Sequence, residues 1–308
     1  MEASITFKSV AKKVKSETIL ADLSFGVEKG TRFALVGTNG SGKTSIIKMI
    51  SGIIQKDKGS IYVKGFDIRS KLNEIKSIIG YMPQNTEFDE DLTVYDNISI
   101  YAQLYGLNKS ILKTKIENLS KELGFYDYLN SYPKSLSYGL SRVVMFSRAV
   151  IHNPEIVLLD EPTSNIDPNY RVVIWNYICN ELKKSTIFYT TNNFNDAQDY
   201  SNRIAILYNG NIKYNGTFEN LVTNTHGLAR FTITFRDKIP NDFIKTISLN
   251  PKIVNSSFSD NIFKFYATEK IEYFKILKYA LDSEIEDVDI SNCSLEDIFK
   301  GINTLDDK

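Results

Sequence analysis

The sequence predicts an α/β domain followed by a smaller α+β domain, and three observations support this. Apolar runs alternate with segments of helical periodicity along residues 1–228, which is typical of an α/β sheet. A glycine-rich loop at residues 37–44 joins one apolar run to an apolar helix. Residues 229–308 show the order strand, helix, strand, strand, helix, strand, which is typical of a ferredoxin-like domain.

The composition is that of an ordinary globular protein. The chain has 308 residues, of which 42% are hydrophobic and 24% charged, so both domains are long enough to bury a core. Lys and Arg total 37, as do Asp and Glu, and the zero net charge argues against nucleic acid as the main partner. The two cysteines show no CxxC spacing, no apolar stretch is long enough to span a membrane, and the N-terminus lacks signal-peptide features. We therefore expect a cytoplasmic protein whose role at a membrane would depend on a partner.

The elements of the first domain can be placed in order along the chain. Residues 4–10 and 18–28 alternate in the manner of strands, and the lysine-rich residues 12–15 predict a turn between them. The glycine-rich loop follows a buried strand at 33–36 and opens a helix that ends near Ser51. The remaining pattern predicts strands at 60–63, 78–82, 156–160, 186–190 and 203–207, and helical segments at 92–123 and 171–183. The helical insertion defines a subdomain at about residues 88–147.

The second domain follows from shorter apolar runs. Its predicted strands lie at residues 231–235, 253–258, 262–267 and 285–290. Its predicted helices lie at residues 241–247 and 271–281. Ser294, followed by acidic residues, is expected to cap a final helix.

The glycine-rich loop predicts a phosphate-binding site. Residues 37–44 read Gly-Thr-Asn-Gly-Ser-Gly-Lys-Thr, the pattern GxxxxGK[ST] of the Walker A motif. The glycines let backbone N–H groups point at phosphate oxygens, and the helix that follows adds its positive end. Lys43 is predicted to reach the β- and γ-phosphates, and the Thr44 hydroxyl to bind Mg²⁺. The residues predicted to bind ATP are Gly37, Thr38, Asn39, Gly40, Ser41, Gly42, Lys43, Thr44 and Ser45.

Two carboxylates follow the buried run at residues 156–160. Asp160 ends this strand, where a carboxylate can hold Mg²⁺ through water, and Glu161 follows, where it can act as a general base toward an attacking water. Such a pair alone would be interpreted as a solvated turn. Downstream of a phosphate loop, it favours hydrolysis of ATP.

On these motifs, residues 4–220 resemble the nucleotide-binding subunit of an ABC transporter, which has a P-loop NTPase core. The phosphate loop is followed by a segment ending at Gln84 that is similar to the Q-loop, and Leu136–Leu140 lies where the LSGGQ signature belongs. The segment after Glu161 resembles the one leading into the D-loop, which includes Asp167.

The resemblance implies a composite site. Two subunits of this family hold two ATP molecules between them, head to tail, so that the signature of one faces the phosphate loop of the other. Ser137, Tyr138 and Gly139 would then serve the ATP of a second subunit in a homodimer or heterodimer, and Asp167 would lie in the D-loop. Gln84 would contact Mg²⁺, together with Thr44 and Asp160, and sense an integral membrane permease.

The resemblance also bears on the kind of transporter. Residues 91–107 and 294–299 are similar to segments of exporter-type ATPases, so we expect an efflux system with this subunit peripheral on the inner face of the cell membrane. Two alternatives remain: a slow or non-hydrolytic ATP-binding regulatory subunit, and a soluble ABC ATPase.

Three positions depart from the family pattern. Asn192 lies where the family usually has a histidine, and loss of a charge-assisted hydrogen bond costs about 1.5–3 kcal/mol, or about ten- to hundredfold in rate. Tyr138 replaces the first signature glycine, and Val14 lies where an aromatic ring would stack on adenine. These changes are interpreted either as neutral drift or as marks of a slow ATPase that needs a complementary partner. The two histidines, His152 and His226, are expected at the surface.

Overall fold

The structure is a computed structural model that describes residues 3–224, 229–239, 243–245, 253–267, 276, 278, 285–292 and 294–299. The chain forms two compact units, Met1–Gly216 and Thr217–Lys308. The division lies before helix α8 (Phe218–Asn224), whereas the boundary predicted at residue 228 lies after it. Within the described residues, no helix has the length and apolarity that a membrane crossing requires.

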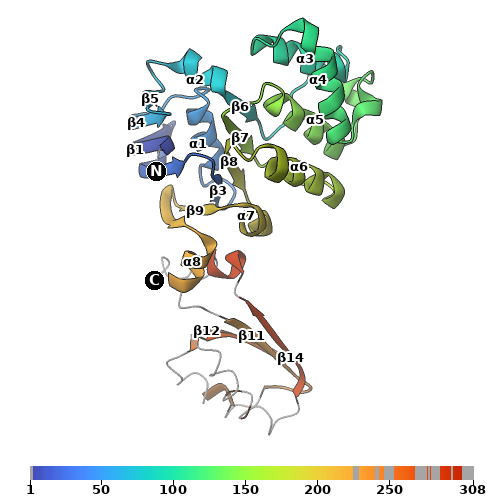
Figure 1. Cartoon of the computed structure of the whole chain (residues 1–308). Coiled ribbons are helices and arrows are strands. Elements are labelled where there is room, and N and C mark those ends of the chain that lie inside the picture. The colour runs from blue at the N-terminus through green and yellow to red at the C-terminus, as the bar shows by residue number, and fades with distance from the viewer. Residues whose placement is uncertain are drawn as a thin grey trace. The chain divides into compact units, whose positions relative to one another are not determined.

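The first unit is built on a six-stranded sheet in the order β10-β9-β3-β8-β7-β6 (Figure 1). All neighbours in it pair in parallel except β10, which pairs antiparallel with β9. Every residue of β7 is buried, which explains why its sequence is a continuous apolar run. The strands are β3 (Arg32–Val36), β6 (Ile79–Met82), β7 (Ile156–Asp160), β8 (Thr186–Thr191), β9 (Arg203–Tyr208) and β10 (Asn211–Gly216).

A second, antiparallel sheet has the order β2-β1-β4-β5. The predicted lysine-rich turn at residues 12–15 is wrong, because Val14 still pairs with Glu17 and only Lys15 and Ser16 form the turn. This end of the hairpin is largely exposed, so lysines are compatible with a strand there. The strands are β1 (Ala3–Val14), β2 (Glu17–Glu28), β4 (Lys58–Val63) and β5 (Phe66–Asp67).

Helix α1 (Lys43–Ile50) packs between the two sheets (Figure 1). Its apolar residues belong to one buried cluster with residues of both sheets. Within that cluster Phe7, Phe25, Phe33 and Phe188 form a continuous stack, with ring centroids 4.5, 5.9 and 5.4 Å apart. The N-terminus of α1 is therefore fixed by a packed core on two sides.

The predicted helical segment at residues 92–123 divides into two helices. Gly106 adopts a φ of 81° after the first, and the Asn108 side chain caps the second by accepting a hydrogen bond from the Ser110 backbone N–H. The helices of the insertion are α3 (Val94–Leu104), α4 (Lys109–Glu122) and α5 (Tyr138–Val150), with 3₁₀ turns at Tyr126–Tyr128 and Pro133–Ser135. The other helices are α2 (Leu72–Ile78), α6 (Pro168–Glu181) and α7 (Phe194–Tyr200).

The second unit contains an antiparallel sheet in the order β12-β13-β11-β14. This is the ferredoxin-like arrangement that the sequence predicts, with the first and third strands in the middle. Ser294 caps the final helix as expected, since its hydroxyl accepts a hydrogen bond from the Asp297 N–H at 3.2 Å. Most of the two predicted helices, together with His226 and Cys293, lies outside the described residues. The strands are β11 (Ala229–Phe235), β12 (Ile253–Ser259), β13 (Ile262–Ala267) and β14 (Ile285–Asn292).

Candidate active site

The phosphate loop connects β3 to α1, and its backbone requires glycine. Gly40 and Gly42 adopt φ angles of 80° and 104°, which favour glycine strongly over other residues. A Cβ on Gly37 would lie only 2.6 Å from the Leu207 carbonyl oxygen and 2.7 Å from Ser41 Oγ. The loop is therefore a narrow backbone turn at the N-terminus of a buried helix, as phosphate binding requires.

Two side chains of this loop are suited to bind a phosphate. Lys43 is 5% exposed, and its Nζ donates to the carbonyl oxygens of Gly37 and Thr38 at 2.8 and 3.0 Å. Burial lowers the pKa of Lys43, and the charges of Glu161 and Asp160 oppose that shift. Buried Ser41 Oγ has no hydrogen-bond partner in the described part of the chain. An unpaired buried hydroxyl and a buried cation on the same loop fit phosphate oxygens.

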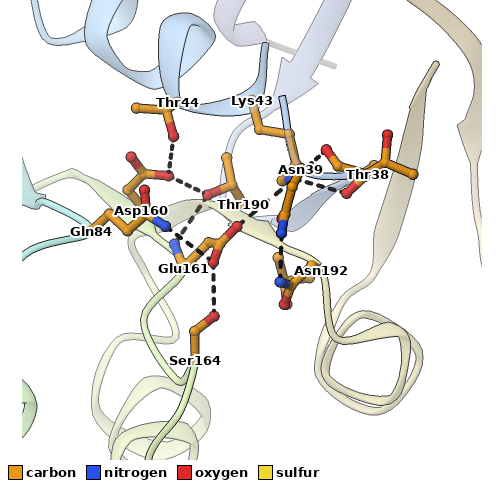
Figure 2. Close-up of polar contacts among 12 residues, drawn as sticks. Thr38, Asn39, Lys43, Thr44, Gln84, Asp160, Glu161, Ser164, Thr190 and Asn192 are labelled. Atoms are coloured by element: carbon orange, nitrogen blue, oxygen red, sulfur yellow. Dashed lines mark hydrogen bonds and ion pairs between the residues drawn. The ribbon is translucent and has the colours of Figure 1, made fainter. Parts of the chain in front are cut away.

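Asp160 lies at the end of β7 with one oxygen engaged and one free. Its Oδ1 accepts hydrogen bonds from Thr190 Oγ1 at 2.6 Å and Thr44 Oγ1 at 3.2 Å (Figure 2). Buried Oδ2 has no partner among the described residues. Burial raises the pKa of Asp160, whereas the hydrogen bonds from Thr190 and Thr44 oppose that shift. A bound cation would offset the free-energy cost of burying this charged carboxylate.

Mg²⁺ fits this position. The Thr44 hydroxyl and the Asp160 carboxylate are the hard oxygen ligands that Mg²⁺ prefers. No group of three His, Cys, Asp or Glu side chains that could hold a metal occurs among the described residues. A Mg²⁺ ion at this position would therefore complete its shell with water and nucleotide phosphates.

Glu161 is held at the strand tip in a specific orientation. Its φ of 47° is unusual for a side-chain-bearing residue, and its N–H donates to Thr190 Oγ1 at 3.0 Å. The carboxylate oxygen Oε2 accepts hydrogen bonds from Ser164 Oγ at 3.0 Å and Gln84 Nε2 at 3.4 Å (Figure 2). Oε1 lies 3.8 Å from Lys43 Nζ. Such an orientation suits a general base, since the carboxylate is fixed before any water arrives.

The structure brings most of the predicted site residues together and adds others. Asn192 follows β8, and its Nδ2 lies 3.5 Å from Asn39 Oδ1 of the phosphate loop, on the exposed side. Sequence reasoning missed Thr190, Ser164 and Arg142. Thr190 belongs to no motif, and the pairing of β7 with β8 places it beside Asp160.

The signature residues lie on another part of the unit. Ser137 is the N-cap of α5, where its Oγ accepts a hydrogen bond from the Leu140 N–H at 3.3 Å. A Cβ on Gly139 would lie 2.4 Å from the Tyr170 ring. The side chain of Tyr138 is 49% exposed. In the described chain none of these residues hydrogen bonds to its own phosphate loop.

Two further predicted positions are placed by their elements. Asp167 is the N-cap of α6, where Oδ1 accepts a hydrogen bond from the Asn169 N–H at 2.8 Å. Val14 is 48% exposed at the end of the β1–β2 hairpin.

The expectation that His152 is a surface residue is wrong. Its ring is partly buried and stacks on Tyr105, with centroids 3.7 Å apart. Its Nε2 lies 3.2 Å from the Ile79 carbonyl oxygen. Burial lowers the pKa of His152 to about 4, so the ring is neutral near pH 7 and acts in packing.

Comparisons with known proteins identify the family of this chain. A family model described as ABC transporter matches residues 20–164. The ABC transporter ATP-binding protein NatA of Bacillus subtilis (strain 168) is 32% identical over 223 residues, covering 71% of this chain and 89% of NatA. The methionine import ATP-binding protein MetN 4 of Oceanobacillus iheyensis is 32% identical over 260 residues, covering 82% of this chain and 75% of MetN 4. The Nod factor export ATP-binding protein I of Burkholderia thailandensis is 31% identical over 209 residues, covering 68% of this chain and 69% of that protein.

A solved structure supports the same assignment. The ATP-binding subunit of an ABC transporter superposes with a TM-score of 0.67 at 26% identity, covering 72% of this chain and 92% of that one. The α/β fold of a P-loop ATPase that the sequence predicts is therefore confirmed. Its motifs, its relatives and its fold show that this chain belongs to the ABC transporter family, as an ATP-binding subunit.

Proposed function

We propose that this subunit hydrolyses ATP with Mg²⁺ and thereby drives an exporter whose pore is formed by a separate membrane permease. The observation that carries the proposal is the set of contacts around Glu161. Its carboxylate is 8% exposed, lies 3.8 Å from Lys43 and accepts hydrogen bonds from Gln84 and Ser164. A regulator that only bound ATP would have no need of a carboxylate fixed in this way.

The geometry supports the following division of work. Lys43 and the loop amides bind the β- and γ-phosphates, and Glu161 takes the proton of the water that attacks the γ-phosphorus. The bond to the ADP oxygen breaks, and ADP and inorganic phosphate leave. When bound, Mg²⁺ neutralises charge on the β- and γ-phosphate oxygens. Gln84 and Ser164 keep Oε2 of Glu161 turned into the site.

The position of the signature supports dimerisation. Ser137, Tyr138 and Gly139 lie at the start of α5 and do not bond to the phosphate loop of their own chain. A second nucleotide-binding subunit, arranged head to tail, brings such a helix N-terminus to the γ-phosphate. Tyr138 is exposed at that position, so we expect it to lie in the subunit interface.

A groove beside the Q-loop suits the permease. It has a volume of about 230 Å³, and its apolar lining includes Leu104 and Ile100, which are 78% and 47% exposed. Glu87 and Asp89 give the lining two negative charges, and Arg148 gives it one positive charge. We expect the occupant to be a short helix of the permease that carries apolar and basic side chains. Such a contact would hold the subunit at the inner face of the cell membrane.

The direction of transport rests on the resemblance to exporter-type ATPases at residues 91–107 and 294–299. Relatives with printed names for import and for export both match this chain, so the site alone does not separate the two directions. A slow or non-hydrolytic regulatory role is the second candidate, favoured by Asn192 at the exposed side of the site.

The proposal is tested by phosphate release from Mg·ATP, with the purified chain alone and with its permease in vesicles. We expect turnover that the permease stimulates and that Glu161→Gln abolishes. Absence of turnover in both settings would contradict hydrolysis and favour the regulatory role. Recovery of ribosomes and no integral membrane protein in a pull-down would instead identify a soluble ABC ATPase.

A further inference from the structure

We propose that Arg142 is a positioning residue that couples the signature helix to both the Q-loop and the catalytic carboxylate. This proposal rests on the proposed ATPase function and adds a residue that positions its catalytic groups. Arg142 lies in the second turn of α5, which begins at Tyr138. Its guanidinium donates to backbone carbonyl oxygens, so its role is to hold backbone.

The contacts of Arg142 join two loops that are far apart in the sequence. Its Nη1 donates to the carbonyl oxygens of Pro83 at 2.8 Å and Gln84 at 2.6 Å. Its Nη2 donates to the carbonyl oxygens of Glu161 at 2.9 Å and Asp160 at 3.4 Å. One planar guanidinium therefore fixes the backbone of the Q-loop relative to the tip of β7.

Burial makes this arrangement costly and therefore informative. Arg142 is 0% exposed, and within the described chain no carboxylate lies within ion-pair distance of it. Burial lowers its pKa, while the charges of Tyr138, Asp160 and Glu161 oppose that shift. Burying a charged side chain is costly unless hydrogen bonds or opposite charges compensate for its desolvation. Its hydrogen bonds to the two loops give a reason to keep it.

The same geometry predicts how a change in the signature helix reaches the site. Ser137 and Tyr138 lie one turn before Arg142, so a rotation of α5 moves the guanidinium. The carbonyl oxygens of Gln84 and Glu161 share that guanidinium, so both loops must respond together. Because Glu161 holds a φ of 47°, a small change in its peptide redirects its carboxylate. Engagement of the signature by a second subunit would thereby align Gln84 and Glu161.

The experiment uses the full chain with Arg142→Met, Arg142→Lys and a control on the same helix. Arg142→Met keeps side-chain volume and removes the donors, and Arg142→Lys keeps the charge but not the planar fork. The control is Ser147→Ala, since Ser147 is also 0% exposed but donates only to Val144 of its own helix. Affinity for a fluorescent ATP analogue, kcat, KM and amide hydrogen exchange are measured for each.

We expect both Arg142 variants to keep ATP affinity and KM within about threefold while kcat falls about hundredfold, as for a misplaced catalytic group. Amide exchange should rise together at residues 81–88 and 160–166, and Ser147→Ala should change neither quantity. Unchanged kcat in Arg142→Met, or full activity in Arg142→Lys, overturns the proposal. An equal loss of kcat in Ser147→Ala also overturns it, because the effect would then be general to α5.

Two readouts separate this proposal from the ATPase function on which it rests. If the wild-type chain shows no turnover, the ATPase proposal fails, yet the joint rise in exchange at the two segments still tests the coupling. If Arg142→Met does not fold, amide exchange in the wild-type protein still tests the coupling. In it, the amides of residues 84–86 and those of residues 161, 163 and 164 should open at the same rate, and clearly different opening rates would contradict the coupling.

Discussion

Lys43 of the phosphate loop and Glu161 of the β7 tip form a buried ion pair, with Nζ 3.8 Å from Oε1 and side chains 5% and 8% exposed. The cation expected to bind the γ-phosphate is thus adjacent to the carboxylate that we propose as the general base. When ATP arrives, phosphate oxygens and Glu161 both attract Lys43. We therefore expect ATP binding and ATP hydrolysis to depend on Glu161 in opposite ways.

This relationship predicts the behaviour of Glu161→Gln. Loss of the general base should lower kcat by at least about hundredfold. ATP affinity should stay the same or increase, because Lys43 no longer pairs with a carboxylate and is fully available to phosphate. Equilibrium binding of a fluorescent ATP analogue and phosphate release measure the two effects.

The control for Glu161→Gln is Glu155→Gln, since Glu155 is half exposed and pairs with Lys64 away from the site. It should change neither quantity. A marked loss of ATP affinity in Glu161→Gln would show that the carboxylate instead holds Lys43 in its binding position.

The first unit should lose stability in acid through His152. Its pKa is lowered to about 4 by burial, against an ordinary value of 6.5. In the unfolded chain the ring takes up a proton as pH falls below about 6.5, whereas in the folded chain it stays neutral. The stability contributed by this difference is complete above the unfolded pKa and is lost as pH falls toward the folded value. Its loss amounts to roughly 3 kcal/mol at most.

The measurement is urea unfolding over that pH range in the wild type and in His152→Phe, which keeps the stacking on Tyr105. Trp175 is the single tryptophan of the chain and lies buried in the first unit, so its fluorescence reports unfolding of that unit. The variant should lose less stability than the wild type. Parallel pH curves for the two proteins would exclude His152 as the source.

Asp196 should be a strong determinant of stability in the first unit. Its carboxylate is fully buried and accepts hydrogen bonds from Arg171 at 2.5 Å, Trp175 at 3.0 Å and Thr163 at 2.6 Å. Asp196→Ala leaves three donors unpaired, one of them charged, and should lower the free energy of unfolding by about 3 kcal/mol. Urea unfolding measures this change.

The control for Asp196 is Asp199→Ala on the same helix, because Asp199 is exposed. Its effect should stay within about 0.5 kcal/mol. Equal effects of the two substitutions would mean that α7 itself, and not the buried carboxylate, is the source of the stability. Thr163 follows Glu161 closely in the chain, so Asp196→Ala should also lower kcat.

Features encoded by neighbouring residues were predictable from the sequence. Residues 37–44 carry their glycines and Lys43 in one motif, and the apolar run of β7 ends at Asp160 in a way that only a buried parallel strand explains. The lysines at 12–15 were misinterpreted, because charged residues at a solvent-exposed hairpin end obscure strand alternation.

Residues brought in by tertiary structure were not predictable in this way. Thr190 reaches Asp160 because β7 and β8 pair with these two residues in register. Arg142 reaches the Q-loop because the helix after the signature packs against β6. Neither side chain belongs to a local pattern, and nothing in the sequence alone marks an arginine that donates to loop carbonyls.

Asn192→His should raise the rate of hydrolysis. Asn192 lies at the open side of the site, with Nδ2 3.5 Å from Asn39 Oδ1 of the phosphate loop. A histidine there reaches farther, and when protonated it donates a charge-assisted hydrogen bond to phosphate. Such a bond contributes about 1.5–3 kcal/mol, so kcat should increase about ten- to hundredfold if the bond forms only in the transition state. Phosphate release at saturating ATP measures the gain.

Two matched variants identify the source of that gain. Asn192→Gln lengthens the side chain without charge, and Asn192→Ala removes the amide. If charge is the missing element, only the histidine variant accelerates hydrolysis, and its advantage should decrease as pH rises and the ring loses its proton. Equal acceleration by glutamine would assign the deficit to reach. A tenfold loss in Asn192→Ala with no gain from histidine would show that the asparagine already performs this task (about 1.4 kcal/mol).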